Sequence, residues 1–415
     1  MGKARGAAAV GSGAGILQVT FAAVVMQLCL GTVYGWSVFV NPLMEQHHWG
    51  RPQVVLAFSL AIAGIGIGAF LVSARADRHP RQVATLGGLM FGIGTVLAGL
   101  AVQAGNLVLL YIGYGLLGGV GIGLAYLTPI AVAIKWAPHR RGLVSGLVVM
   151  GFGAGAFIIG KIAPGLIDSI GSGMTLIGLG LAFTVVCTAM GLLMRNPPSY
   201  TPKEAKWSLI PREALGRGEF WILWGMLFLN VCAGIALISQ AASMFQDLHE
   251  VTAAQAGLLV SAIAICNGLG RMFWSAVSEK TGRPAVFLFM FISQTGLFVL
   301  LPQISSAWLF AVVCCYIILC YGGGFGTMPA FTADLFGSDQ VGRVYGPMLT
   351  AWSAAGVVGP MLYAGILETS AARGLAADYG YSISMCITAG LLLAACALPV
   401  LVMSRRTTAV GAAVS

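Results

Sequence analysis

Residues 16–40 read ILQVTFAAVVMQLCLGTVYGWSVFV, a run of 25 residues without a charged side chain. A helix rises about 1.5 Å per residue, so this run can cross the roughly 30 Å hydrocarbon core of a bilayer. Only helices and closed barrels satisfy their own backbone hydrogen bonds in hydrocarbon, and the sequence lacks the ten-residue alternating strands of a barrel. The run therefore predicts a membrane-spanning helix, since it is also too long for a signal-peptide core.

The same pattern recurs along the whole chain. Charged residues make up 8% of the 415 residues, whereas soluble domains contain about 25%. Cutting the sequence at charges and turn residues gives twelve apolar segments, at 16–40, 53–74, 82–102, 107–134, 142–168, 173–194, 219–246, 254–277, 284–302, 306–333, 343–368 and 378–403. We therefore predict an all-α membrane protein with twelve transmembrane helices, which excludes a soluble fold.

The basic residues predict the orientation of these helices. If the N-terminus is cytoplasmic, 18 of the 22 Lys and Arg residues lie in cytoplasmic segments, and only Arg51 and Arg373 lie in outer loops. Cytoplasmic loops of membrane proteins carry such an excess of basic residues. We expect both termini in the cytoplasm and the chain in the cytoplasmic (inner) membrane.

A polar stretch at residues 195–218 divides the chain into an N-terminal half, residues 1–194, and a C-terminal half, residues 219–415. Two positions illustrate a weak repeat between the halves, because Pro129 recurs as Pro329 and Gly146 as Gly346. We therefore predict two pseudo-symmetric six-helix bundles joined by a cytoplasmic linker.

Several other classes of site are disfavoured. The net charge of +9 is scattered in short clusters, which argues against a nucleic-acid partner. The nine cysteines lie in apolar runs without CxxC spacing, so we expect no disulfide and no metal site. The glycine runs at 118–123 and 151–155 follow no strand, so we assign them to helix packing and expect no cofactor; no Walker motif indicates ATP binding.

Arg271 is the most informative single residue. It lies about eight residues, or roughly 12 Å, inside span eight, where a charge costs at least about 2.5 to 3.5 kcal/mol. No other span offers a mid-membrane acid as its partner, so we expect Arg271 to face a cavity and bind a carboxylate through its two-pronged guanidinium. The other in-span cation, Lys161, is near a helix end, and we expect it to reach the interface.

Five aromatic residues beside glycines are candidates for lining that cavity: Tyr34, Tyr126, Tyr321, Phe325 and Trp352. An aromatic cage would suit a small, partly apolar anion, with tyrosine hydroxyls donating to its oxygens. Each residue taken singly is also compatible with ordinary helix packing.

The loops after spans two and eight, SARADRHPR at 73–81 and SAVSEKTGR at 275–283, resemble the signature loop of the major facilitator superfamily. The resemblance implies a structural role, as a cytoplasmic latch between helices, for Asp77, Arg78, Arg81, Glu279, Lys280 and Arg283. Ser73 and Pro80 depart from this pattern, because the family has glycine at both positions.

Four stretches resemble the oxalate/formate antiporter and monocarboxylate transporter branch of this superfamily. They are YGWSVFVNP at 34–42, KWAPHRRGLVSGLVVMGFG at 135–153, REALGRGEFWILW at 212–224 and NGLGRMFW at 267–274. The aligned arginine of this branch binds the substrate carboxylate, and the aromatic positions line the cavity in its oxalate-carrying members.

Two departures from the branch bear on the substrate. Trp352 stands where oxalate-carrying members have a lysine that forms a second cationic site, which favours a substrate with one carboxylate. Asn267 stands where proton-coupled animal members have an aspartate, and an amide cannot take over the protonation switch of that aspartate.

These observations predict a monomeric secondary active transporter of small monocarboxylates, such as lactate or pyruvate, that works by alternating access with proton symport or anion exchange. The alternative within transport is an oxalate/formate-type dicarboxylate exchanger. A transporter-like sensor and a membrane enzyme are the alternatives of other classes, and the spans contain no His/Asp/Glu cluster that would favour an enzyme.

Overall fold

The computed structural model describes residues 13–137, 141–198, 200, 212–336 and 341–404. The first group of elements is α1 (Gly13–Gly31), η1 (Thr32–Gly35), α2 (Ser37–His47), α3 (Arg51–Arg78), α4 (Pro80–Gln103), α5 (Leu107–Leu110), the π-helix η2 (Tyr111–Gly118), α6 (Gly119–Trp136), α7 (Arg141–Ala154) and α8 (Ala156–Leu192). The second is α9 (Arg212–Gly216), α10 (Gly218–His249), α11 (Ala253–Thr281), α12 (Arg283–Leu300), η4 (Leu301–Gln303), α13 (Ala307–Phe336), α14 (Val341–Met348), α15 (Thr350–Ala372) and α16 (Ala377–Ala395). The described part of the chain is therefore helical, as the apolar runs predict.

The described residues contain eleven helices that are long and apolar enough to cross a membrane. The longest of them, Gly146–Leu192, has 47 residues, about twice the length of one span. Its path changes at Gly171, whose φ of 79° and ψ of 162° are not helical and are open to glycine because it has no Cβ. Gly171 thus separates two spans, in agreement with the predicted segments 142–168 and 173–194.

Three predicted spans are each made of more than one helical element, with a break between them. The first span changes from α1 to a short 3-10 helix that contains Tyr34 before α2 begins. The fifth is interrupted at Gly155, between α7 and α8, and the eleventh at Leu349, between α14 and α15. Two of these interruptions bring irregular backbone next to an aromatic candidate, Tyr34 or Trp352.

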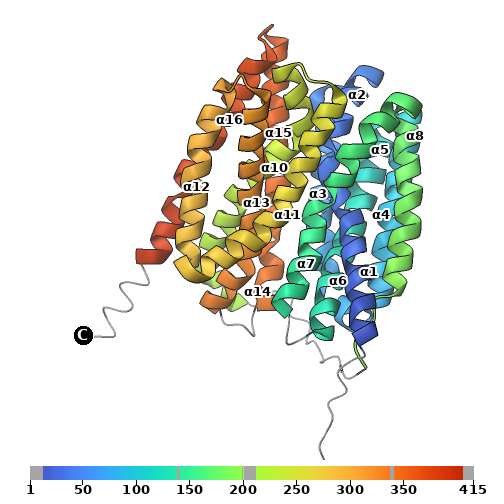
Figure 1. Ribbon diagram of the computed structural model, residues 1–415, viewed down its shortest axis with the longest axis vertical. Helices are drawn as coiled ribbons and strands as arrows, with labels where there is room; N and C mark the ends of the chain where they lie inside the picture. Colours follow the sequence, from blue (N-terminus) through green and yellow to red (C-terminus); the bar gives the residue numbers. More distant parts are fainter. Residues whose placement is uncertain (1–12, 138–140, 199, 201–211, 337–340, 405–415) are drawn as a thin grey trace, which may run out of the picture.

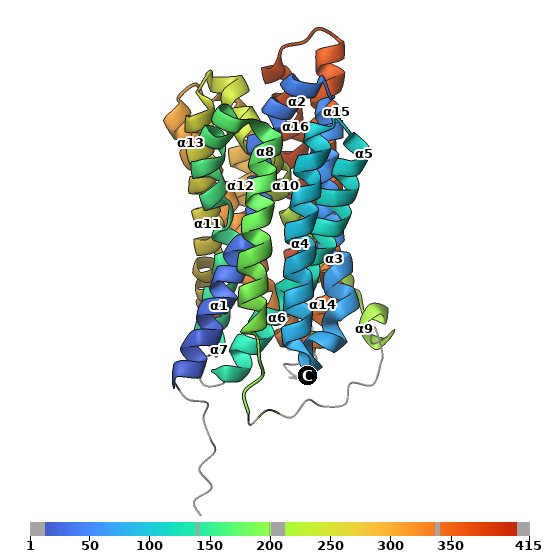
Figure 2. The ribbon, with the colours of Figure 1, turned by 90° about the vertical axis from the view of Figure 1, so that its right-hand side faces the viewer.

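The two groups of helices lie side by side (Figure 1), with the blue to green helices of residues before 195 on the right and the yellow to red helices of residues after 217 on the left. Within the first group, α4 lies along α8 (Figure 2). Between the groups, α3 contacts α15, α11 contacts α7 and α8, and α2 contacts α10. We call the end of the molecule at which α2 ends and α3 begins the far end, because it lies opposite the start of α1.

Candidate functional site

Arg271 lies on α11, between the two groups of helices, and is only 3% exposed. Its Nη1 lies 3.5 Å from the hydroxyl of Tyr126 on α6, and its guanidinium carbon lies 5.0 Å from the ring centre of Phe325 and 5.9 Å from that of Phe152. Its Nε and Nη2 are buried without a hydrogen-bond partner. Among the described residues no carboxylate pairs with it, so this cation has free donors for an anion.

Close packing of α11 against α13 sets this position. A Cβ on Gly326 of α13 would collide with the backbone carbonyl of Arg271, and a Cβ on Gly322 would collide with that of Asn267. The absence of side chains there lets the backbones approach, as small residues do in membrane helices. This approach brings Arg271 beside Phe325, which also lies on α13.

Aromatic rings from both groups surround Arg271. Tyr126 lies 5.6 Å and Phe325 5.1 Å from Trp352 of α15, measured between ring centres. Tyr321 lies 5.4 Å from Phe325 and 6.0 Å from Tyr34. These edge-on contacts are the geometry that aromatic pairs prefer. The structure thus joins all five aromatic candidates into one cage around the arginine.

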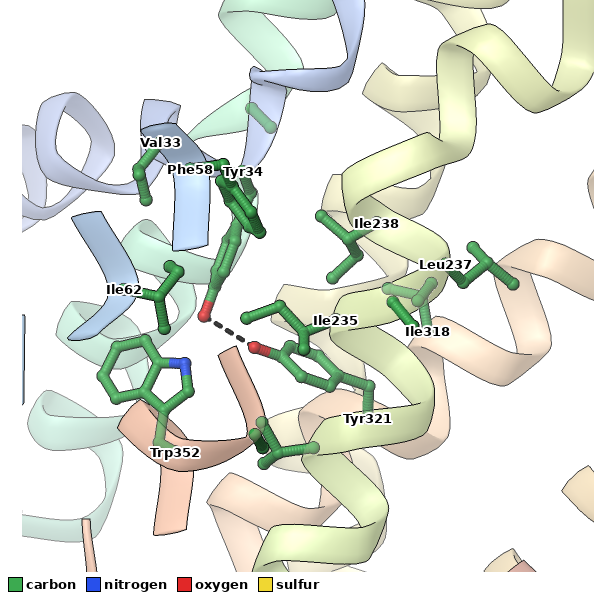
Figure 3. Packing of buried hydrophobic residues seen from close by; sticks show 14 of the residues in the cluster. Val33, Tyr34, Phe58, Ile62, Ile235, Leu237, Ile238, Ile318, Tyr321 and Trp352 are labelled. Carbon is green, nitrogen blue, oxygen red and sulfur yellow. Dashed lines mark hydrogen bonds between the residues drawn. The ribbon is translucent and has the colours of Figure 1, made fainter. Parts of the chain in front are cut away.

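The hydroxyls of Tyr34 and Tyr321 form a hydrogen bond of 2.8 Å across the boundary between the two groups (Figure 3). Each side chain is at most 2% exposed. Asn267 lies one helical turn before Arg271 on α11 and, together with Tyr34, lines a small cavity between the groups. Its Oδ1 is buried without a partner. Both hydroxyls and this amide therefore offer polar atoms next to the cage.

Phe152 of α7 is a cage residue that the sequence analysis missed. Its ring lies 4.8 Å from that of Tyr126, 5.4 Å from that of Tyr34 and 5.9 Å from that of Trp352. It stands within the glycine run 151–155, which was assigned to helix packing as a whole. An aromatic side chain within a glycine run, like those at the other candidates, was the signal that could have identified it.

Two buried amide side chains support the cage tyrosines and were also missed. Gln27 of α1 donates from Nε2 to the carbonyl of Tyr126 at 3.0 Å, and Asn230 of α10 donates from Nδ2 to the carbonyl of Tyr321 at 3.3 Å. Gln294 of α12 in turn donates to Oδ1 of Asn230 at 3.3 Å. In each group of helices, therefore, an amide side chain donates a hydrogen bond to the backbone carbonyl of a cage tyrosine. These amides lie on α1 in the first group and on α10 in the second.

A second polar cluster lies at the far end. Arg51, the first residue of α3, forms an ion pair of 3.0 Å with Asp247 of α10. The same guanidinium donates to Gln240 and to the hydroxyl of Tyr381 of α16, both at 3.2 Å, and Tyr381 donates to Asp247 at 2.8 Å. The sequence analysis placed Arg51 in an outer loop, whereas the structure makes it the first residue of α3 and a contact between the two groups of helices.

The model of the Major Facilitator Superfamily matches residues 22–360 and, separately, residues 233–413. The chain belongs to this superfamily. The oxalate:formate antiporter of Oxalobacter formigenes is 26% identical over 404 residues, which cover 93% of this chain and 91% of that protein. Apicoplast pyruvate carrier 1 of Toxoplasma gondii is 23% identical over 443 residues, which cover 80% of each protein. The resemblance to the antiporter and monocarboxylate branch is confirmed.

A solved structure shows the same fold. It is that of a bacterial homologue of the human lysosomal transporter Spinster, which is 19% identical, with a TM-score of 0.73 over 94% of this chain and 97% of that one. The protein is therefore a major facilitator transporter, a class that is not enzymatic, and a multi-pass protein of the inner membrane.

The signature loops of the superfamily differ in what they contact. Arg283 lies 3.6 Å from Asp334 and donates to the carbonyl of Ser275 at 3.2 Å and to the hydroxyl of Ser278, so it joins α11, α12 and α13. Four other charged side chains of the two motifs are exposed, namely Arg78, Arg81, Glu279 and Lys280. The side chain of Asp77 lies outside the described residues.

Proposed function

We propose that this transporter moves small monocarboxylates of the lactate and pyruvate type, with Arg271 as the anchor of the carboxylate. The observation that carries the proposal is the buried guanidinium with two unpartnered nitrogens inside an aromatic cage. An unpaired buried cation is costly, and a carboxylate that accepts from both prongs would offset that cost. Tyr126 would donate to the same anion, because its hydroxyl lies next to Nη1.

The proposed mechanism is alternating access, with residues 1–194 and 219–415 as two six-helix bundles that rock about the site and with 195–218 as their cytoplasmic linker. Two hydrogen bonds cross between the groups at the site, Tyr34 to Tyr321 and Arg271 to Tyr126. With both termini in the cytoplasm, the far end would face outwards. The cluster around Arg51 would then hold the outer side closed and would have to separate before substrate enters from outside.

The number of cations supports one carboxylate over two. Arg271 is the one charged side chain that the described residues place in the cage, and Trp352 occupies the position that a second cation has in oxalate-carrying relatives. The similarity to the oxalate:formate antiporter supports the alternative to this proposal, a dicarboxylate exchanger. A dianion in this cage would leave one charge uncompensated, at a cost of several kcal/mol.

The same charge count suggests the coupling. An empty carrier would have to move Arg271 without a counter-charge, whereas a loaded carrier would move a neutral pair. This favours anion exchange, or a proton that travels with the substrate. Uptake of lactate into vesicles with an empty interior, without any dependence on pH, would contradict this account.

Uptake by the purified protein in proteoliposomes tests the substrate class. Radiolabelled lactate is supplied, and unlabelled pyruvate, acetate, formate and oxalate are added in turn as competitors. We expect uptake of lactate and competition by pyruvate, with little competition by oxalate. Absence of lactate uptake, or stronger competition by oxalate than by pyruvate, would reject the monocarboxylate proposal.

A further inference from the structure

The indole N–H of Trp352 is an unexplained donor in the cage. The side chain is 1% exposed, and its Nε1 has no hydrogen-bond partner. Trp36 is equally buried, yet its Nε1 donates to the carbonyl of Val54 at 3.1 Å. Other tryptophans that donate this hydrogen are Trp136, Trp221 and Trp224. Trp274 also has a buried Nε1 without a partner, but its ring packs against Phe273 and Phe289, outside the cage. Buried tryptophan nitrogens normally have a partner, so the N–H of Trp352 needs an acceptor that the protein does not provide.

Trp352 lies where the body of a bound acid would be. Its ring contacts those of Tyr126, Phe152 and Phe325, three side chains that also contact the Arg271 guanidinium. In Figure 3 the indole nitrogen is on the edge of the ring that faces the hydroxyl of Tyr34. The guanidinium and the indole therefore share the same three neighbouring rings, so an acid whose carboxylate accepts from Arg271 would have its body next to Trp352.

The relative position of these two donors does not depend on the movement of the halves. Arg271 lies on α11 and Trp352 on α15, both in the second group of helices. If the groups move as the proposed function requires, the guanidinium and the indole N–H stay together. The two side chains therefore keep the same spacing as donors, one to a carboxylate and the other to one further acceptor of the same ligand.

We propose that Trp352 is a specificity residue whose N–H donates to an oxygen on carbon 2 of the acid, so that the transporter selects 2-hydroxy and 2-oxo monocarboxylates. This inference rests on the proposed monocarboxylate function. An indole nitrogen only donates, so it accepts a hydroxyl and a keto oxygen as partners alike. An acid without that oxygen leaves the N–H unpaired once the cage closes and excludes water, and sites of this kind reject such analogues.

Matched pairs of acids test the inference on the wild-type protein. Lactate and propionate differ by the oxygen on carbon 2, as do glycolate and acetate. The measurement is the concentration of each that halves the uptake of radiolabelled lactate into proteoliposomes at pH 7, where all four are anions. We expect the oxygen-bearing member of each pair to compete at least about tenfold more strongly. Equal potency within the pairs would overturn the inference while leaving the monocarboxylate function intact, whereas absence of any lactate uptake would reject that function itself.

The variant Trp352→Phe keeps an aromatic ring and removes the N–H. We expect competition by lactate and pyruvate to weaken about three- to tenfold, and competition by propionate to stay unchanged, which also shows that the variant is folded. Trp224→Phe is the matched control, because it removes an N–H that is bonded to Thr350 outside the cage. Equal weakening for lactate and propionate in Trp352→Phe would mean that Trp352 only packs, and would overturn the inference.

Discussion

Arg271 and Arg51 both lie between the two groups of helices, but their surroundings are opposite. Arg51, at the far end, faces the carboxylate of Asp247, the hydroxyl of Tyr381 and the amide of Gln240. Arg271, at the centre, faces aromatic rings and the hydroxyl of Tyr126 at the long distance of 3.5 Å. Both terminal nitrogens of Arg51 have partners in the protein, whereas Nε and Nη2 of Arg271 have none.

The difference separates two uses of the same side chain. A paired arginine holds parts of the fold together, because its partners are always present. An unpaired, buried arginine destabilises the fold unless a ligand supplies the missing acceptor. We therefore propose that the far-end cluster acts in closure and the central cage in binding. Each of the following changes tests one of these two roles.

The largest effect is expected at Arg271. Replacing it with Gln removes the charge, and we expect uptake of lactate to fall at least about 100-fold, since a buried charge pair would be lost. The thermal midpoint should stay the same or rise, because an uncompensated buried charge is removed. The first expectation is measured as lactate uptake into proteoliposomes, and the second as the thermal midpoint of unfolding of the purified protein.

Lys161→Gln is the matched control for Arg271→Gln. Lys161 is the other in-span cation, but it is exposed on α8. We expect lactate uptake by the Lys161→Gln variant to remain near the wild-type level. A variant Arg271→Gln that transports lactate normally, or that loses its stability together with its transport, would contradict the assignment of Arg271 to the binding site.

Breaking the far-end ion pair should have a smaller, conformational effect. Arg51→Gln or Asp247→Asn removes one partner of a pair whose side chains are 12% and 21% exposed. We expect a loss of about 1 to 2 kcal/mol for the closed state, or roughly a tenfold rise in the population open at the far end. The rate at which an impermeant thiol reagent labels Ile238→Cys from outside reports this population, in a background without the nine native cysteines.

An exchange of the two charges controls for local damage. In the double variant Arg51→Asp, Asp247→Arg the pair can form again, so labelling should return towards the slow rate. Continued fast labelling in the exchanged variant would indicate that the cluster does not close the far end.

The sequence alone singled out Arg271 as a candidate, because a charge within an apolar run is visible without a structure. The aromatic candidates were found for the same reason, since they stand beside glycines in such runs, and the structure brings them together. The pairing of Arg51 with Asp247 could not be predicted, because Arg51 lies between two apolar runs and its partner lies 196 positions away in the sequence. Long-range packing of helices decides such contacts.

The fold shows the same division. Twelve apolar runs predicted the spans, and Gly171 accounts for the two that merge into one long helix. The interruption of the first span at Tyr34 was not predicted, since the run 16–40 contains no charged residue that would mark a break. Hydropathy records whether a segment can cross a membrane, but not where its backbone departs from a regular helix.

An intermediate effect is expected when the amide that bonds to the backbone of Tyr321 is removed. Asn230→Leu removes the donor to the carbonyl of Tyr321 and one of the two acceptors of the Gln294 amide, which still donates to the carbonyl of Met290. We expect a loss of about 1 to 3 kcal/mol in stability and about fivefold weaker lactate competition, because Tyr321 is held less firmly. Gln246→Leu is a control, since that amide donates within its own helix at the far end of α10. Unchanged lactate competition in Asn230→Leu would show that the amide only stabilises the fold.

The smallest effect is expected at Tyr381. Its hydroxyl donates to Asp247 and accepts from Arg51, but the ion pair of 3.0 Å remains when the hydroxyl is removed. Tyr381→Phe should therefore raise the labelling of Ile238→Cys only about two- to threefold, which corresponds to one hydrogen bond of about 0.5 kcal/mol. Tyr363→Phe removes a hydroxyl that bonds to Thr388 away from Arg51, and it should leave labelling unchanged. If Tyr381→Phe opened the far end as much as Arg51→Gln does, closure would depend on the hydroxyl bridge, and the contrast between a charge-paired and an unpaired arginine would not explain how the two ends of the molecule differ.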